Sequence, residues 1–375
     1  MLDVDPALLG DTDERKQLRE VLRDFFTEAA ASQDVREHLT TGREHDPALW
    51  ARMATELGVQ GLVIPEEYGG SGFSFAELAV VFEEAGRALL CAPLLSTTVL
   101  ATYTLLLSGD REACARYLPG IAEGTRTATV AGFDEGGGGG LRATPGKGGW
   151  VGSGAADFVL DGYGADLILV AARTADGAGL FACEREAEGL TRTARTVLDG
   201  TRPQALVTFA DTPFTQIGQP GNAAAITGRV LDIGRAALAA EQVGGSVHAL
   251  DATMSYVLQR RQFGRQIGSF QAIKHRLADL LVEIEAARSA AVYAVACVTA
   301  SAEHLPVAAS TAKVVCSGAY RQATAEYVQL HGGIGFTWEH SAHLYLRRAR
   351  AAEVLFGTAD DHRARLGGLL GFNVA

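Results

Sequence analysis

The sequence of 375 residues predicts an α+β fold, in which helical regions flank a β-rich middle region. Up to about Thr125, apolar side chains recur every three or four residues, which is typical of amphipathic helices. The next stretch has short apolar runs separated by Gly, Asp and Thr clusters, as in a sheet. From Asn222 onward, long Ala-rich segments are helical again. We therefore expect three regions, 1–125, 126–220 and 221–375.

Local signals place the elements within these regions. Ser74 and Glu77 form a capping-box pattern, which opens a helix. In the first region we expect helices at 13–31, 47–57, from Ser74 onward, 93–108 and 110–121. Strands are expected at 127–131, 150–151, 158–160, 167–170, 179–182 and 205–209, and long helices at 223–259, 270–301 and 307–330.

Composition and charge exclude several classes of protein. The 33 basic and 44 acidic residues leave a net charge of −11, whereas a nucleic-acid binder needs a basic face. No apolar run reaches the roughly 18 residues of a membrane span, and the N-terminus lacks the parts of a signal peptide. Five widely spaced cysteines without a CxxC pair predict a reduced, cytoplasmic protein. Histidines and acids show no metal-ligand spacing, so no metal site is expected.

Two connections between expected helices concentrate residues suited to an anionic ligand. The segment 260–271 carries three arginines, whose planar forks match phosphate or carboxylate, and two glycines. The segment 329–337 carries three glycines, which expose backbone amides. The alternatives are a solvated turn for the first and an ordinary helix C-cap for the second, with His331 as a packed histidine.

Glycine is unevenly distributed, with 13 of the 44 glycines between Gly132 and Gly164. The run 136–140 has neither the GxGxxG nor the P-loop pattern. We interpret it as a flexible surface loop rather than as a phosphate cradle.

Three segments together resemble the acyl-CoA dehydrogenase family. They are 58–72, 260–271 with the following Ala-Ile-Lys-His, and 329–337. The α–β–α order and the total length are also similar to this family. The resemblance implies an N-terminal helical domain, a middle β-domain and a C-terminal four-helix bundle, which form tetramers that bind FAD and acyl-CoA.

The same resemblance implies a catalytic glutamate, which removes the α-proton of the thioester while flavin N5 accepts the β-hydride. Usually this glutamate stands directly before Gly-Thr, where the present chain has Phe356. Some members carry it before an arginine of the first bundle helix, where this chain has Gly234. Neither residue can accept a proton, so no catalytic residue is expected at either position. Glu241 and Glu353 are the nearest carboxylates in sequence, as substitute bases or as ordinary helix residues.

In the family, each flavin is shared between two subunits, and the neighbour supplies contacts to its ADP half. The residues that a subunit donates to its neighbour's flavin are present in this chain. They are Arg260, Phe263, Gln271, Gln329, Gly332 and Gly333.

The residues that a subunit uses for its own flavin depart from the family pattern. The usual Thr-Glu-Pro-Gly is replaced by Gly-Phe-Asp-Glu-Gly at 132–136, followed by more glycines. The usual Trp-Ile-Thr-Asn-Gly strand reads Phe-Val-Leu-Asp-Gly at 158–162 and loses its hydroxyl. The glutamine after Gly-Thr is replaced by Asp360. We interpret the glycine run as a place where binding residues have been lost.

This asymmetry resembles the base-lacking subunit of heteromeric α2β2 acyl-CoA dehydrogenases of actinobacterial type, which act on bulky CoA thioesters such as steroid side chains. The expected partners are a catalytic acyl-CoA dehydrogenase subunit in a heterotetramer, an acyl-CoA substrate, and electron-transfer flavoprotein or a similar acceptor. One alternative is a homotetrameric flavoenzyme with different chemistry, either a flavin monooxygenase or an enzyme with a relocated base. Another is a purely structural or regulatory paralogue that binds no flavin.

Overall fold

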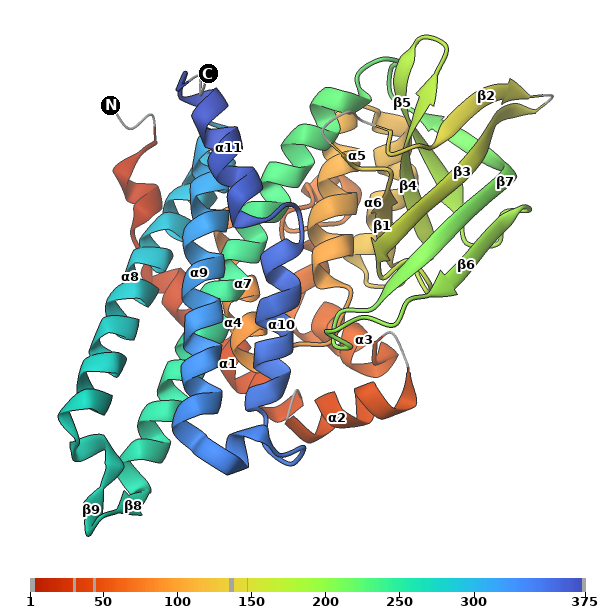
Figure 1. Ribbon diagram of the computed structural model, residues 1–375. Coiled ribbons are helices and arrows are strands. Elements are labelled where there is room, and N and C mark those ends of the chain that lie inside the picture. The colour runs from red at the N-terminus through yellow and green to blue at the C-terminus, as the bar shows by residue number, and fades with distance from the viewer. Residues whose placement is uncertain (1–3, 30–31, 43–44, 135–137, 147, 373–375) are drawn as a thin grey trace. The chain divides into compact units, whose positions relative to one another are not determined.

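The computed structural model describes residues 4–29, 32–42, 45–134, 138–146 and 148–372 (Figure 1). The chain divides into two compact units. A helical unit comprises Met1–Arg36, Phe75–Leu90 and Arg235–Ala375, and a β unit comprises Glu37–Ser74 and Cys91–Gly234. The α–β–α order predicted from the sequence is confirmed, since the strands of the large sheet lie between Ala128 and Ile217.

The helical unit is built mainly from long helices. They are α1 (Asp13–Ala29), α4 (Phe75–Ala88), the part of α7 (Ala223–Gln259) from Arg235 onward, α8 (Gln271–Thr299), α9 (Leu305–His331), α10 (Ala342–Val354) and α11 (Ala359–Leu369), with the short η1 (Pro6–Leu9). Helix α2 (Ser32–Thr41) contributes to both units. The three long helices expected at 223–259, 270–301 and 307–330 are confirmed as α7, α8 and α9. Of the helix expected at 13–31, the last two residues lie outside the described residues.

A seven-stranded sheet forms the centre of the β unit. Its strands are β1 (Ala128–Ala131), β2 (Arg142–Gly146), β3 (Gly149–Leu160), β4 (Leu167–Thr174), β5 (Gly177–Glu184), β6 (Leu190–Ala194) and β7 (Gln204–Ile217). The strands follow the order β1-β4-β2-β3-β7-β5, with β6 beside β7. Strand β4 also pairs with β5, so the sheet closes on itself. The helical elements of this unit are α3 (Pro47–Leu57), η2 (Val59–Gly61), η3 (Glu66–Tyr68), η4 (Leu95–Ala101), α5 (Thr102–Ser108) and α6 (Arg111–Ala122).

Aromatic side chains fill the core of the closed sheet. The rings of Phe181 and Phe214 stack with centroids 5.6 Å apart, and Phe209 meets Phe214 edge-on at 5.1 Å. Trp150 packs on Phe181 and donates from Nε1 to Gln216, so its polar end is satisfied at the edge of the core. Sequence patterning did not predict β2 and β6, because both are short and largely exposed.

The helix expected at 93–108 is only partly an α-helix, which corrects the sequence prediction. Its first part, η4, is a π-helix, and the α-helical turns of α5 follow. Threonine hydroxyls compete here for backbone carbonyls: Thr98 donates to Leu94 O at 2.7 Å and Thr102 donates to Thr97 O at 2.8 Å. Because the second bond reaches back five residues, it fits the wider π turn.

Helices α4 and α7 cross at backbone contact. A Cβ at Gly86 would come within 2.0 Å of Glu241 O, and one at Gly244 within 1.8 Å of Glu83 O. Glycine is therefore required at both positions of this crossing.

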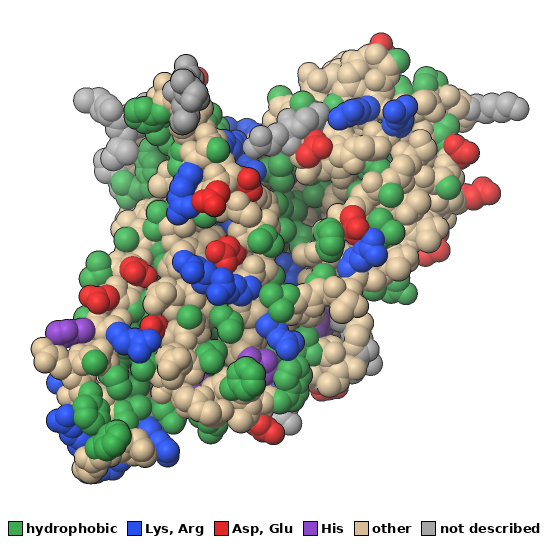
Figure 2. Space-filling view, viewed as in Figure 1, with side chains coloured by type: hydrophobic (Ala, Val, Ile, Leu, Met, Phe, Trp, Pro, Cys, Tyr) green, Lys and Arg blue, Asp and Glu red, His purple; other side chains and the backbone are tan. Residues whose placement is uncertain are grey.

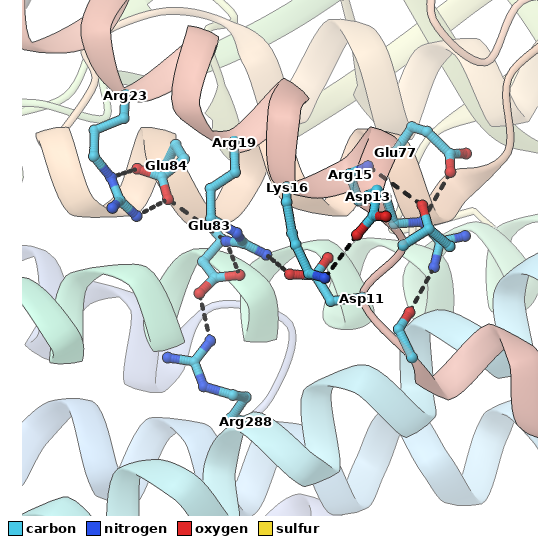
Figure 3. Close-up of polar contacts among 12 residues, drawn as sticks. Asp11, Asp13, Arg15, Lys16, Arg19, Arg23, Glu77, Glu83, Glu84 and Arg288 are labelled. Atoms are coloured by element: carbon cyan, nitrogen blue, oxygen red, sulfur yellow. Dashed lines mark hydrogen bonds and ion pairs between the residues drawn. The ribbon is translucent and has the colours of Figure 1, made fainter.

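Beside this crossing, a row of arginines on α1 ties α1 to α4 (Figure 3). Arg15, Arg19 and Arg23 follow one another at intervals of four residues, which places them on one helix face. They meet Glu77 at 2.9 Å, Glu83 at 2.7 Å and Glu84 at 2.7 Å, respectively. From α8, Arg288 also reaches Glu83, at 2.5 Å, so this carboxylate joins three helices.

The free energy of unfolding should therefore decrease at acidic pH, because the Glu83 carboxylate becomes protonated. Burial acts to raise the pKa of this carboxyl, but Arg19 and Arg288 outweigh burial and hold the pKa below 4.5. A depressed pKa in the folded state stabilises the protein above the ordinary pKa, and this contribution is lost as the pH falls through 4.5 and below. We expect Glu83→Gln to lower the free energy of unfolding at neutral pH by about 2 kcal/mol, the scale of a hydrogen bond to a charged group.

Urea unfolding of Glu83→Gln and wild type between pH 7 and pH 3 measures this effect. The difference between the two proteins should shrink as the pH falls. Asp13→Asn is the matched control, because the exposed Asp13 has Lys16 of the same helix as its one ion-pair partner in the described part of the chain. A difference that stays constant down to pH 3 would contradict the linkage.

Candidate functional site

The residues expected to contact a neighbour's flavin lie at one end of the helical unit. Arg260 directly follows α7, and Gln329 lies in the last turn of α9. Tyr256, one turn before Arg260, stacks on His331, the last residue of α9, with ring centroids 4.2 Å apart. The two segments singled out in the sequence are therefore neighbours in space.

The connection 260–271 contains a short β-hairpin at the tip of α7 and α8 (Figure 1). Strand β8 (Arg261–Gln262) pairs with β9 (Arg265–Gln266), and Phe263 and Gly264 make the turn with φ of 51° and 79°. Two positive φ angles define the hairpin turn that suits the twist of the strands. Ile267, which opens η5 (Ile267–Ser269), donates to Arg260 O at 2.8 Å and closes the hairpin.

The hairpin presents apolar and basic groups to the outside. Phe263 is 92% exposed, although it is a phenylalanine at a strained positive φ. The Arg265 guanidinium lies 4.0 Å from the centroid of Phe270, whereas the Arg260 side chain contacts no ion-pair or hydrogen-bond partner among the described residues. Figure 2 shows basic and hydrophobic side chains together over this end of the unit.

The second expected segment is the connection after α9. Gly332 adopts φ 62°, and its N–H donates to Gln329 O, which ends the helix; η6 (Gly332–Phe336) follows. A Cβ at Gly332 or Gly333 would meet open space, so the backbone is accessible at both glycines. The Gln329 side chain is exposed. Phe336 and Trp338, at 85% and 50% exposure, extend the apolar surface of this connection.

The donor chemistry of this end fits the ADP half of FAD. A guanidinium, two primary amides and accessible glycine backbone are groups that bind a pyrophosphate. Gln271, the second amide, begins α8, and its Nε2 lies 3.4 Å from His275 Nε2. The residues predicted to hold a neighbour's flavin thus lie at the same end of the helical unit, with Arg260, Gln271 and Gln329 exposed.

The two expected base positions lie far from this end. Gly234 and Arg235 stand on α7 some 25 residues before Arg260, which corresponds to about 37 Å of helix. Gly234 is buried. Phe356 lies between α10 and α11 with φ 60°, and its carbonyl oxygen accepts from Arg235 Nε at 3.2 Å and from His362 Nε2 at 2.9 Å.

Cationic and imidazole groups hold the Phe356 loop. Buried Lys313 donates from Nζ to Ala352 O at 3.0 Å and to Glu353 O at 2.9 Å, and so caps the C-terminal end of α10. Burial, helped by Arg235, lowers the pKa of Lys313 to about 8. Burial also lowers the pKa of His362, to which the nearby cations contribute. The backbone carbonyls around Phe356 are therefore held by Arg235, Lys313 and the imidazole of His362.

Sequence reasoning missed Lys313 and His362. One signal could have indicated Lys313. It is a single lysine on the helix face that otherwise carries small buried residues, such as Ala309, Ala312 and Cys316. His362 gave no signal, because its partner is a backbone carbonyl.

Both candidate substitute bases are engaged by arginines. Glu241 is buried and lies 3.2 Å from Arg348 Nη1, which is also buried. Glu353 is half-buried and lies 3.3 Å from Arg350 and 3.6 Å from Arg321. These contacts are those of structural ion pairs.

In the β unit, the residues expected to serve the chain's own flavin are engaged within the unit or exposed. The Asp134 carboxylate accepts from Gly138 N at 3.1 Å and Gly139 N at 3.0 Å, so this part of the glycine run binds an acid of its own chain. Residues 135–137 of the run lie outside the described residues. Buried Asp161 accepts from Ser96, while Phe158 is 60% exposed at φ 54°.

Asp360, expected to replace a flavin-site glutamine, is an exposed residue of the first turn of α11. It forms an ion pair at 2.6 Å with Arg363, which lies three residues further along the same helix. The adjacent Thr358 and Asp361 form a capping box, so this stretch follows ordinary helix-start chemistry.

Comparison with known proteins assigns this fold and these segments to a family. The acyl-CoA dehydrogenase N-terminal domain matches residues 12–125, and the acyl-CoA dehydrogenase C-terminal domain matches residues 221–368. Acyl-CoA dehydrogenase IpdE2 of Mycolicibacterium smegmatis is 35% identical over 355 residues, which cover 95% of this chain and 98% of the relative. The chain belongs to the acyl-CoA dehydrogenase family, whose members are FAD-dependent oxidoreductases.

Solved structures agree with this assignment. A variant of the Tcur3481–Tcur3483 steroid ACAD aligns with a TM-score of 0.86 and 33% identity, covering 96% of this chain and 98% of that one. The ChsE4–ChsE5 complex of Mycobacterium tuberculosis aligns with a TM-score of 0.89 and 25% identity, covering 98% and 100%. Among the described residues, no helix has the length and apolar character of a membrane span, and no group of His, Cys, Asp and Glu could hold a metal ion.

Proposed function

We propose that this chain is the base-lacking subunit of a heteromeric FAD-dependent acyl-CoA dehydrogenase. The observation that carries the proposal is Phe356, which stands where the family has its glutamate and whose carbonyl oxygen contacts Arg235 and His362. A general base for this reaction must place a proton acceptor beside the α-carbon, and in the family this group is a carboxylate. Glu241 and Glu353, the nearest in sequence, are held by arginines.

In this proposal, the chain binds the ADP half of a flavin whose ring is held by a catalytic partner. Arg260 would bind the pyrophosphate with its planar fork, and Gln329 and the amides of Gly332 and Gly333 would donate to its oxygens. When bound, FAD would accept the hydride that leaves the β-carbon of the substrate. The partner would supply the glutamate, and exposed Phe263 would dock against the partner's surface.

The proposed substrate is the CoA thioester of a bulky acyl group, such as a steroid side chain. Its support is the similarity to a structure described as a steroid ACAD and to a complex of two different chains. Electron-transfer flavoprotein or a similar acceptor would reoxidise the flavin.

Flavin counting tests the proposal. The full chain is purified alone and after co-expression with a catalytic acyl-CoA dehydrogenase subunit, and FAD is measured per polypeptide. We expect little FAD and no α,β-desaturation with the chain alone, and FAD held by the mixed complex. Stoichiometric FAD with desaturation of an acyl-CoA by the chain alone would overturn the proposal. So would oxygen consumption by the chain alone with an external flavin reductase, which would support a monooxygenase.

A further inference from the structure

At this end of the helical unit, a stacked pair of rings joins the two segments proposed to donate to the pyrophosphate. These donor segments are 260–271 and 329–337. Tyr256 lies in the last turns of α7 and His331 ends α9, and their rings stack with an interplanar angle of 24°. Tyr256 is partly exposed, and its hydroxyl has no hydrogen-bond partner among the described residues. The ring, rather than the hydroxyl, therefore accounts for its contact with α9.

His331 provides a fixed surface for this stack. Its side chain is buried, and Nδ1 lies 2.8 Å from Tyr327 O. Since a carbonyl oxygen only accepts, Nδ1 carries the proton and donates. Tyr327 meets the imidazole edge-on at 4.9 Å, and His340 lies at 4.5 Å from it. The orientation of the ring is thus set on several sides.

Each ring lies within a few residues of the groups proposed to bind the pyrophosphate. Arg260 N donates to Tyr256 O at 2.8 Å, which continues the helical pattern of α7 up to the start of the hairpin. His331 stands two residues after Gln329 and directly before Gly332, whose N–H returns to Gln329 O. The stack is a contact between α7 and α9 at the level where both donor segments begin.

We propose that Tyr256 and His331 are a positioning pair, which sets the distance between Arg260 and the Gln329–Gly333 backbone so that both reach one pyrophosphate. This inference rests on the proposed function and adds residues that do not themselves touch the flavin. Two donors on different helices bind one small anion well only when their separation is held within about 0.5 Å. A stacked pair of rings between the helix ends supplies this constraint, while the hairpin and the glycine turn remain open to the ligand.

The test compares Tyr256→Leu, which removes the ring, with Tyr256→Phe, which keeps it. Both are made in the full chain and assembled with the catalytic subunit. The rate of FAD release is followed by the recovery of flavin fluorescence, and amide hydrogen exchange is followed in 260–268 and 329–335. We expect Tyr256→Leu to speed FAD release about fivefold, the scale of one aromatic pair contact, and to speed exchange in both segments together. Tyr256→Phe should behave as wild type.

A double variant separates positioning from general packing. Once Arg260 is alanine, there is no guanidinium to position, so Tyr256→Leu should add little to the effect of Arg260→Ala. If Arg260→Ala speeds FAD release and Tyr256→Leu does not, or if the two effects multiply fully, the positioning role is overturned and the proposed function stands. If Arg260→Ala leaves FAD release unchanged, the proposed function fails and the positioning role fails with it.

Discussion

Replacing Arg260 with alanine in the assembled complex is expected to weaken FAD binding about 10- to 100-fold, because a hydrogen-bonded contact to a charged group contributes about 1.5–3 kcal/mol. The guanidinium has no ion-pair or hydrogen-bond partner among the described residues, so its loss should leave no uncompensated charge in the free chain. The unfolding temperature of the chain alone should therefore be unchanged. Gln329→Ala should act in the same direction with a smaller effect, because the amide is neutral.

Arg261→Ala is the matched control, since Arg261 lies on the same hairpin and, within the described part of the chain, its side chain donates only to Gly264 O of its own turn. Equilibrium dialysis of FAD against the mixed complex measures all three variants, and raising the salt concentration should weaken wild type more than Arg260→Ala. Equal losses for Arg260→Ala and Arg261→Ala would indicate a general effect of positive charge and would contradict a specific phosphate contact.

Replacing Arg348 with methionine is expected to destabilise the helical unit by about 3–5 kcal/mol, the cost of removing one partner of a buried ion pair. Arg348 and Glu241 are both almost fully buried, at 3% and 6% side-chain exposure, with 3.2 Å between them. Arg348 also donates to Leu90 O at 3.3 Å, so it links α10 to the end of α4. Methionine has a similar volume but leaves the Glu241 carboxylate without this guanidinium.

Arg350→Met, on the same helix, is the control for this variant. Its partner Glu353 is more exposed, and surface pairs contribute less than about 1 kcal/mol. Urea unfolding followed by circular dichroism gives both values. Similar small losses for the two variants would show that Glu241 does not depend on Arg348, and would reopen its candidacy as a substitute base.

Much of the proposed site could be predicted from the sequence because its parts are local. The connection at 260–271 and the glycine turn at 329–337 are continuous segments, in which arginines, glycines and a helix end occur within a dozen residues; the hairpin form of the connection was seen only in the structure. Such signals depend on backbone preferences of neighbouring residues, and tertiary contacts do not change them. The three long C-terminal helices were predicted for the same reason, from uninterrupted Ala-rich periodicity.

Other parts could not be predicted, because they depend on contacts across long separations in the chain. Glu241 and Arg348 are 107 positions apart, and nothing near either residue indicates its partner. The π-helical form of η4 depends on which carbonyls the threonine hydroxyls reach, which helical periodicity does not contain. The role of Asp134 also depends on how the chain returns at Gly138 and Gly139.

By itself, the sequence determined the α–β–α order, the segments that resemble the acyl-CoA dehydrogenase family, and the absence of a carboxylate at Phe356 and Gly234. These are properties of residue identity and local periodicity. Only the tertiary structure decided that the two donor segments meet through Tyr256 and His331, and that Lys313, Arg235 and His362 gather around the Phe356 loop. Burial and proximity create both arrangements, because packing brings together side chains that the chain itself keeps dozens of residues apart.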